Sequence, residues 1–190
     1  MPFFVFIPTN IAFADVLGQT NQFFIDTKYD ESARNSISAT LRYVSDRAYF
    51  YIEDGFYNRI SQTARDNTSL WLNNLSTEFD TRIYPIETNF WGQEYNPGVD
   101  GDPRITILLS PLIETAGGYF DTGNENQKSK DPNSNQREMI YLNVNILNNT
   151  KRISSFLAHE FQHLISFNQK EILRDTGDDI WLNELRSEYS

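Results

Sequence analysis

The pattern of apolar and polar residues predicts strands in several parts of the chain. Five segments have this character, namely residues 22–28, 37–43, 48–52, 104–109 and 139–144. The first three alternate with a period of two residues, which is typical of strands with one buried face. The second and third are separated by an Asp46-Arg47 turn and predict a hairpin. The last two are almost wholly apolar and predict strands in the interior of a sheet.

Two other segments have a helical pattern. Over residues 56–80 the apolar residues recur mostly four apart and form one stripe that would face a core. We expect Pro85 to end this helix. A second helical stripe follows Lys151, with Asn149 or Thr150 as its N-cap. Together these elements predict an α+β fold in which a mixed or antiparallel twisted sheet packs on a long helix.

Two polar segments are predicted to be loops. Residues 121–137 contain no apolar residue, so we expect a long solvated loop, either a lid or a disordered excursion. The Asp100-Gly101-Asp102 sequence has some likeness to a calcium loop, but it lacks the further ligands and the closing glutamate of a twelve-residue site. We interpret it as a plain turn.

Residues 1–14 form an apolar segment too short to span a bilayer as a helix, which takes about 20 residues. The segment ends in Ala12-Phe13-Ala14, the small-residue pattern that a signal peptidase accepts. We therefore expect the end of a secretory signal peptide, with residues 15–190 as the exported domain, although no Lys or Arg precedes the apolar run. The alternative is a buried N-terminal strand.

Composition narrows the possible chemistry. The 190 residues include 26 acidic and 16 basic side chains, for a net charge of −10, which argues against binding to a nucleic-acid backbone. There is no cysteine, so disulfides, thiol nucleophiles and iron–sulfur clusters are excluded. Any metal ion must be held by His, Asp or Glu.

The second helical segment carries a metal-binding motif. His159, Glu160 and His163 form the pattern H-E-x-x-H, and these are the two histidines of the chain. Residues four apart lie one above the other on a helix face, so two imidazoles can converge on one zinc ion. Glu160 lies about 100° further around the helix, within reach of a zinc-bound water. The alternative is a helix with two surface histidines, but the neighbouring residues are apolar.

A third protein ligand must be a carboxylate, because no histidine remains. Ser166 and Gln169 stand where the H-E-x-x-H-x-x-G-x-x-H pattern requires Gly and His, which excludes that class. Glu184 and Glu188 share one face of a predicted C-terminal helix. Glu184 can complete a His₂Glu zinc site, and Glu188 can accept the other ring N–H of a ligand histidine. The alternative is an ordinary exposed acidic face.

HEFQH followed by WLNE resembles the gluzincin metallopeptidases, and most closely the hyicolysin-type extracellular enzymes. The resemblance covers residues 156–190 and implies the N-terminal lobe of a zincin-like fold. It implies that the Glu of the Asn183-Glu184 pair is the third zinc ligand and that Glu188 steadies a ligand histidine. Leu185 stands where these enzymes often have Gly. The resemblance also implies a second lobe beyond Ser190, carrying a residue that stabilises the oxyanion.

These features predict a secreted, monomeric zinc endopeptidase acting on peptides or proteins, with Glu160 as general base. The glycines of Ala116-Gly117-Gly118-Tyr119-Phe120 would let a substrate strand approach an exposed sheet edge, or would form a plain turn. One alternative is a non-catalytic secreted zinc-binding or interaction module, or an inactive fragment. Another is an intracellular hydrolase or aminopeptidase of the same clan, for which the Gly-x-Met-Glu-Asn signature is absent from the sequence.

Overall fold

The computed structural model describes residues 14–176 together with Glu184, Ser187 and Glu188. The segment 1–13, on which the predicted signal peptide depends, and Asn183 lie outside the described residues. No helix in the described part of the chain has the length and the apolar character needed to cross a membrane.

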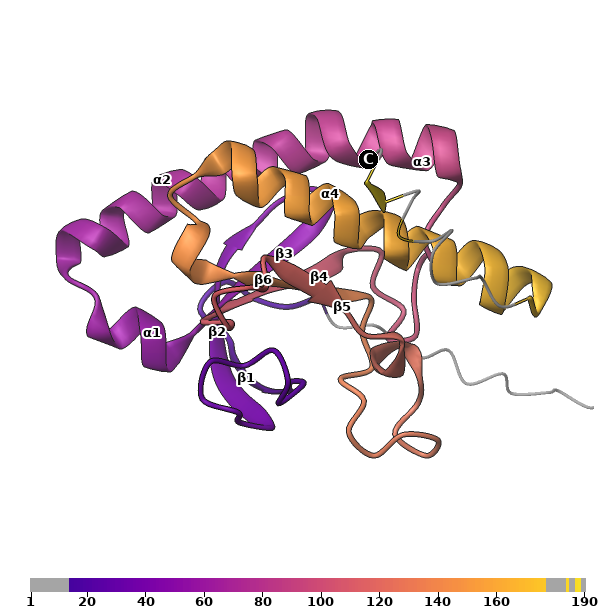
Figure 1. The fold of residues 1–190 in the computed structure, drawn as a ribbon, viewed down its shortest axis with the longest axis horizontal. Coiled ribbons are helices and arrows are strands. Elements are labelled where there is room, and N and C mark those ends of the chain that lie inside the picture. The colour runs from indigo at the N-terminus through magenta and orange to yellow at the C-terminus, as the bar shows by residue number, and fades with distance from the viewer. Residues whose placement is uncertain (1–13, 177–183, 185–186, 189–190) are drawn as a thin grey trace, which may run out of the picture.

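A six-stranded mixed sheet forms the centre of the fold (Figure 1). Its strands are β1 (Thr20–Phe24), β2 (Ser36–Val44), β3 (Ala48–Glu53), β4 (Ile105–Ser110), β5 (Gly118–Phe120) and β6 (Met139–Asn143). They lie side by side in the order β1-β2-β3-β4-β6-β5. The β1-β2-β3 part is antiparallel, β3, β4 and β6 are parallel, and β5 pairs antiparallel with β6 at the edge. This mixed sheet with its helices agrees with the α+β expectation.

The first predicted strand is displaced. β1 covers Thr20–Phe24 and does not extend to residue 28. Its pairing with β2 ends because the Asp26 side chain accepts a hydrogen bond from the Lys28 N–H and turns the chain. Phe23 is buried under the sheet as the alternation predicted.

The prediction that one helix covers residues 56–80 is wrong, and so is the prediction that Pro85 ends it. The segment forms α1 (Asp54–Arg59), α2 (Gln62–Glu78), a π-helical turn (Phe79–Ile83) and α3 (Tyr84–Trp91). Ser61 separates the first two helices because its side chain caps α2 by accepting from the Ala64 N–H. Pro85 lies in the first turn of α3, just after the π turn, where a proline needs no N–H donor.

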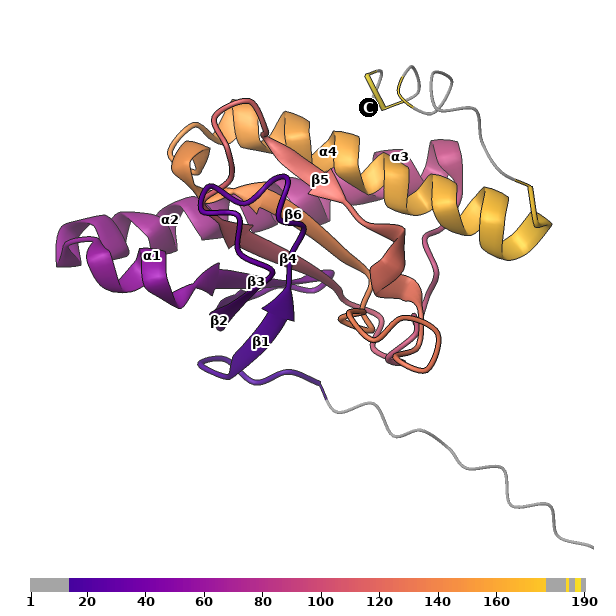
Figure 2. The ribbon, with the colours of Figure 1, turned by 60° about the horizontal axis from the view of Figure 1, so that its bottom comes forward.

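The helices α2, α3 and α4 (Thr150–Phe167) lie on one face of the sheet (Figure 2). The core between them is apolar and includes Phe50, Leu75, Ile107, Leu142 and Phe161. The other face of the sheet has its own buried cluster, rich in tyrosine, which contains Tyr49, Tyr51, Tyr119 and Tyr141. The helix α4 contacts β5 and β6, so its position is fixed relative to the edge of the sheet.

The segment 121–137 is not the solvated loop that its composition predicted. It begins with a 3₁₀ turn, Thr122–Glu125, and buries Asn124, Glu125 and Ser134. The Asn124 amide donates to the Tyr141 hydroxyl at 2.9 Å, and Asn135 exchanges two hydrogen bonds with the backbone of Phe24. Side-chain amides can satisfy buried backbone groups, so a segment without apolar residues can still be packed into the fold.

Candidate metal centre

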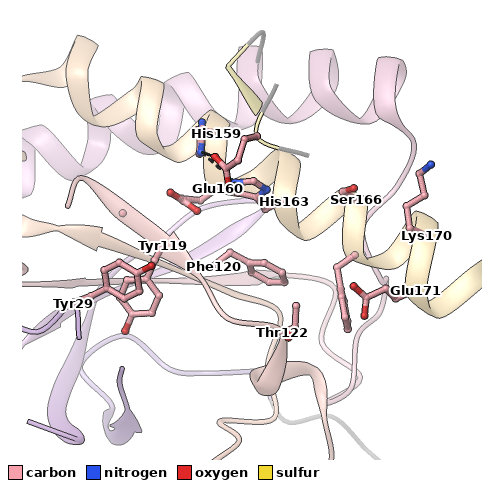
Figure 3. A pocket seen from close by; sticks show the side chains of 13 residues that line it. Tyr29, Tyr119, Phe120, Thr122, His159, Glu160, His163, Ser166, Lys170 and Glu171 are labelled. Carbon is pink, nitrogen blue, oxygen red and sulfur yellow. Dashed lines mark hydrogen bonds and ion pairs between the residues drawn. The ribbon is translucent and has the colours of Figure 1, made fainter. Parts of the chain in front are cut away.

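The helix α4 brings His159, Glu160 and His163 to one side of a cleft (Figure 3). The helix begins where predicted, with the Asn149 side chain accepting from the Arg152 N–H. Its apolar residues face the core, and Phe161 is fully buried. Because the helix is anchored on that side, the two histidines remain on the opposite, partly exposed side.

The two imidazoles converge. Their Nε2 atoms are 3.2 Å apart, and the ring planes are inclined at 83°. Two nitrogens that each lie 2.0–2.1 Å from one tetrahedral zinc ion are about 3.3 Å apart. The spacing of His159 and His163 therefore suits a shared metal ion.

The carboxylate of Glu184 faces this histidine pair. One oxygen lies 3.6 Å from Nε2 of His159 and the other lies 3.7 Å from Nε2 of His163. All three donor groups lie within 4.8 Å of one another, and Glu184 has helical backbone. The nitrogen and oxygen donors fit the His₂Glu set of catalytic zinc sites, which leaves one position open to the cleft.

Glu160 lies between the cleft and the core and is only 7% exposed. Burial, followed by the negative charge of Glu184, raises the pKa of Glu160 to about 8, while a hydrogen bond from the backbone of Phe120 acts in the opposite direction. A divalent cation on the three neighbouring donors would favour the ionised form of Glu160, because opposite charges attract.

The edge strand β5 forms the facing wall of the cleft, which has a volume of about 480 Å³. One edge of β5 pairs with β6, and no strand in the described part of the chain covers the other. Gly118 and Tyr119 line the cleft, but the Tyr119 ring is buried, stacked between Tyr29 and Tyr141.

The glycines of this segment have a role that the sequence did not indicate. A Cβ atom at Gly117 would lie 2.2 Å from the ring of Phe156, and one at Gly118 would lie 2.8 Å from the carbonyl oxygen of Tyr141. The same atom at Gly118 would be 3.1 Å from Cγ of Glu160. These glycines therefore let β5 approach α4 closely.

Ser187 makes one further contact with the centre. The Ser187 hydroxyl lies 3.3 Å from Nε2 of His159 and donates to the Glu184 carbonyl oxygen at 2.8 Å. Glu188 is exposed and borders a neighbouring hollow together with His159 and Glu184. Its N–H donates to the Glu184 carbonyl oxygen, as in a helical turn.

Several residues of the cleft were not singled out in the sequence. They are Tyr29, Thr122, Ser166, Phe167, Lys170 and Glu171. The last four follow His163 on the same helix and its π-helical extension, Asn168–Ile172. Helical spacing from His163 indicates Phe167 and Glu171, whereas Tyr29 and Thr122 reach the cleft through tertiary structure alone.

Comparison with known proteins gives one informative match. The chain is 31% identical over 142 residues to the neutral metalloprotease ShpI of Staphylococcus hyicus. The match covers 62% of this chain and 32% of that protein, so the chain corresponds to about a third of its relative. No family model matches the chain. This similarity relates the chain to a metalloprotease, and it agrees with the prediction that the chain belongs to a metal-dependent peptidase.

Proposed function

We propose that the chain is the metal-bearing part of a secreted zinc metalloendopeptidase of the gluzincin type. The observation that carries this proposal is the convergence of His159, His163 and Glu184 beside the buried carboxylate of Glu160. These donors face an open cleft that is bordered by a free strand edge. The match to a metalloprotease supports the same class.

In this proposal His159, His163 and Glu184 hold zinc, and Asn183 and Glu188 support the ligands. Bound zinc would supply a Lewis acid that polarises a carbonyl group and lowers the pKa of water. Glu160 is the general base: its carboxylate takes the proton of the attacking water and later gives it to the leaving nitrogen. Its nearly buried position beside the histidines, at the wall of the cleft, suits both steps.

The substrate backbone would lie along β5. An extended peptide can add to an open strand edge through main-chain hydrogen bonds, which bind any sequence without a specific side chain. Gly118 would contribute main-chain groups to the substrate, whereas the Phe120 N–H is bonded to Glu160 and keeps this strand close to the general base. The class of substrate is therefore a peptide or an unfolded protein segment.

Metal analysis combined with peptidase assays tests the proposal. The unmodified chain should hold one equivalent of zinc and cleave a mixed peptide library. Glu160→Gln should retain zinc and lose activity by a factor of about 10² or more. His163→Ala should lose the zinc. Glu114→Gln, which changes an exposed acid outside this cleft, is the matched control and should retain both properties.

Two results would overturn the proposal. A chain without zinc, or a His163→Ala variant that keeps a full equivalent, would exclude the ligand set. Undiminished cleavage by Glu160→Gln would exclude the general base. If the chain holds one zinc ion but cleaves no peptide, the proposed metal centre stands and the peptidase assignment for this chain is refuted.

A further inference from the structure

A second group of acidic side chains lies away from the histidine site, where three segments of chain meet. Glu94 follows α3, Glu125 ends the 3₁₀ turn after β5, and Glu138 directly precedes β6. All three are buried, with exposures of 2%, 9% and 2%. Asp100, in the turn before β4, faces the same group and interacts electrostatically with both Glu125 and Glu138.

The carboxylates of this cluster have unused oxygens. Both oxygens of Glu125 are buried without a hydrogen-bond partner, and so is one oxygen each of Glu94 and Glu138. The other oxygen of Glu94 accepts from the Tyr84 hydroxyl at 2.6 Å, and that of Glu138 accepts from the Val99 N–H at 2.8 Å. Buried polar atoms are nearly always paired, so unpaired oxygens on several buried carboxylates that interact electrostatically indicate a missing positive partner.

Among the described residues, no ion pair joins a basic side chain to any of these four carboxylates. Arg137 approaches Asp100, but its guanidinium is bound to the carboxylate of Asp15. A proton shared between Glu125 and Glu138 would neutralise one charge of that pair and leave the free oxygen of Glu94 without a partner. Burial and the neighbouring carboxylates raise the pKa of both Glu125 and Glu138 in the absence of a cation.

We propose that Glu94, Asp100, Glu125 and Glu138 form a calcium-binding site. Calcium takes six to eight oxygen ligands at 2.3–2.6 Å, so donors on opposite sides of the ion are about 5 Å apart. A donor set made only of carboxylate oxygens suits calcium, whereas zinc sites in proteins usually include nitrogen or sulfur ligands.

The backbone at Gly98 is shaped around one of these carboxylates. A Cβ atom at Gly98 would lie 1.7 Å from the unpaired oxygen of Glu138, and the φ of +86° is also one that glycine adopts most easily. The loop between α3 and β4 therefore wraps closely around the proposed site. Bound calcium would join this loop to the 3₁₀ turn whose first residue, Thr122, lines the cleft.

Thermal unfolding of the calcium-depleted chain, at a fixed zinc concentration, tests the site. Calcium at a hundred times its dissociation constant should raise the midpoint by about 5–10 °C, and magnesium should have a much smaller effect. Glu125→Gln should abolish most of the calcium shift. Without calcium the same variant should be at least as stable as the unmodified chain, because a neutral amide replaces a buried carboxyl group that has no cationic partner. Glu31→Gln, at an exposed position, should leave the calcium shift unchanged.

The weakest extracellular calcium modules have dissociation constants of about 10⁻³ M. The proposal is therefore overturned if calcium up to about 10 mM does not raise the unfolding midpoint. A full shift in Glu125→Gln would overturn it equally. If that variant fails to fold, isothermal titration of the unmodified chain with calcium decides, and a chain that takes up no calcium refutes the site. These measurements do not use peptidase activity, so their outcome is independent of the function proposed above.

Discussion

The position of the two histidines depends on how firmly the other side of α4 is held, and Phe161 provides the main contact. Its ring is fully buried and packs edge-on against Phe79, with centroids 5.2 Å apart, and parallel to Tyr84 at 5.4 Å. Both partners belong to the helical segment that continues through Pro85. We predict that Phe161→Ala destabilises the chain strongly.

The magnitude follows from burial. Truncation of a buried Phe to Ala costs about 3–5 kcal/mol through lost transfer energy and the cavity that remains. Full burial and two aromatic contacts place this residue no lower than the middle of that range, at about 4 kcal/mol. With a urea m-value of about 2 kcal/mol/M, the unfolding midpoint falls by about 2 M.

Phe90→Ala is the matched control, because it removes the same atoms from a ring that is 73% exposed and contacts Trp91. We expect a cost of about 1 kcal/mol or less. Urea unfolding followed by circular dichroism, at one zinc concentration, measures both variants. Equal shifts of the two midpoints would show that α4 does not pack on the π turn as described.

Three further predictions concern other parts of the molecule. Burial alone would raise the pKa of Asp30, but its hydrogen bonds with Arg34 outweigh this and hold the pKa below 3.8. The stabilisation from these bonds is therefore present above about pH 5 and is lost as the pH falls below the ordinary pKa of aspartate. Urea unfolding midpoints measured from about pH 3 to 7 should fall towards low pH, and Asp30→Asn should reduce that fall. Gly117→Ala should lower both stability and peptidase activity because of its clash with Phe156, and Phe156→Ala should partly restore stability in the double variant, whereas additive losses would contradict the clash. If the proposed export holds, N-terminal sequencing of secreted material should return Asp15 as the first residue, and a chain that retains the apolar segment would exclude cleavage there.

The sequence predicted the parts of the site that depend on local periodicity. The spacing of His159 and His163 fixes their common helix face, and Asn149 marks the start of that helix through the hydrogen-bonding chemistry of its side chain. The composition left only a carboxylate as a candidate third ligand, and the resemblance to the gluzincins implied Glu184, which the structure places beside both histidines.

The features that could not be predicted depend on contacts between distant segments. Proline usually ends a helix, but the π turn before Pro85 allows the helix to continue. No local sequence pattern predicts this π turn. The polar segment 121–137 resembles a solvated loop in composition, but Asn124 and Asn135 tie it to the sheet. The burial of Glu125 and Glu138 likewise depends on tertiary packing, because acidic residues in sequence normally indicate an exposed surface.

Glu160 connects the two walls of the cleft, α4 and β5, because of its angular position on α4. It lies about 100° from His159, which faces the cleft, and about 100° from Phe161, which faces the core, so its carboxylate is buried at the boundary. From there it accepts a hydrogen bond from the backbone of Phe120 in β5. The carboxylate proposed to move the proton is thus also a contact between α4 and the edge strand. Glu160→Gln keeps the carbonyl acceptor for that contact, so it separates the loss of the base from a loss of strand position, which Glu160→Ala would confound.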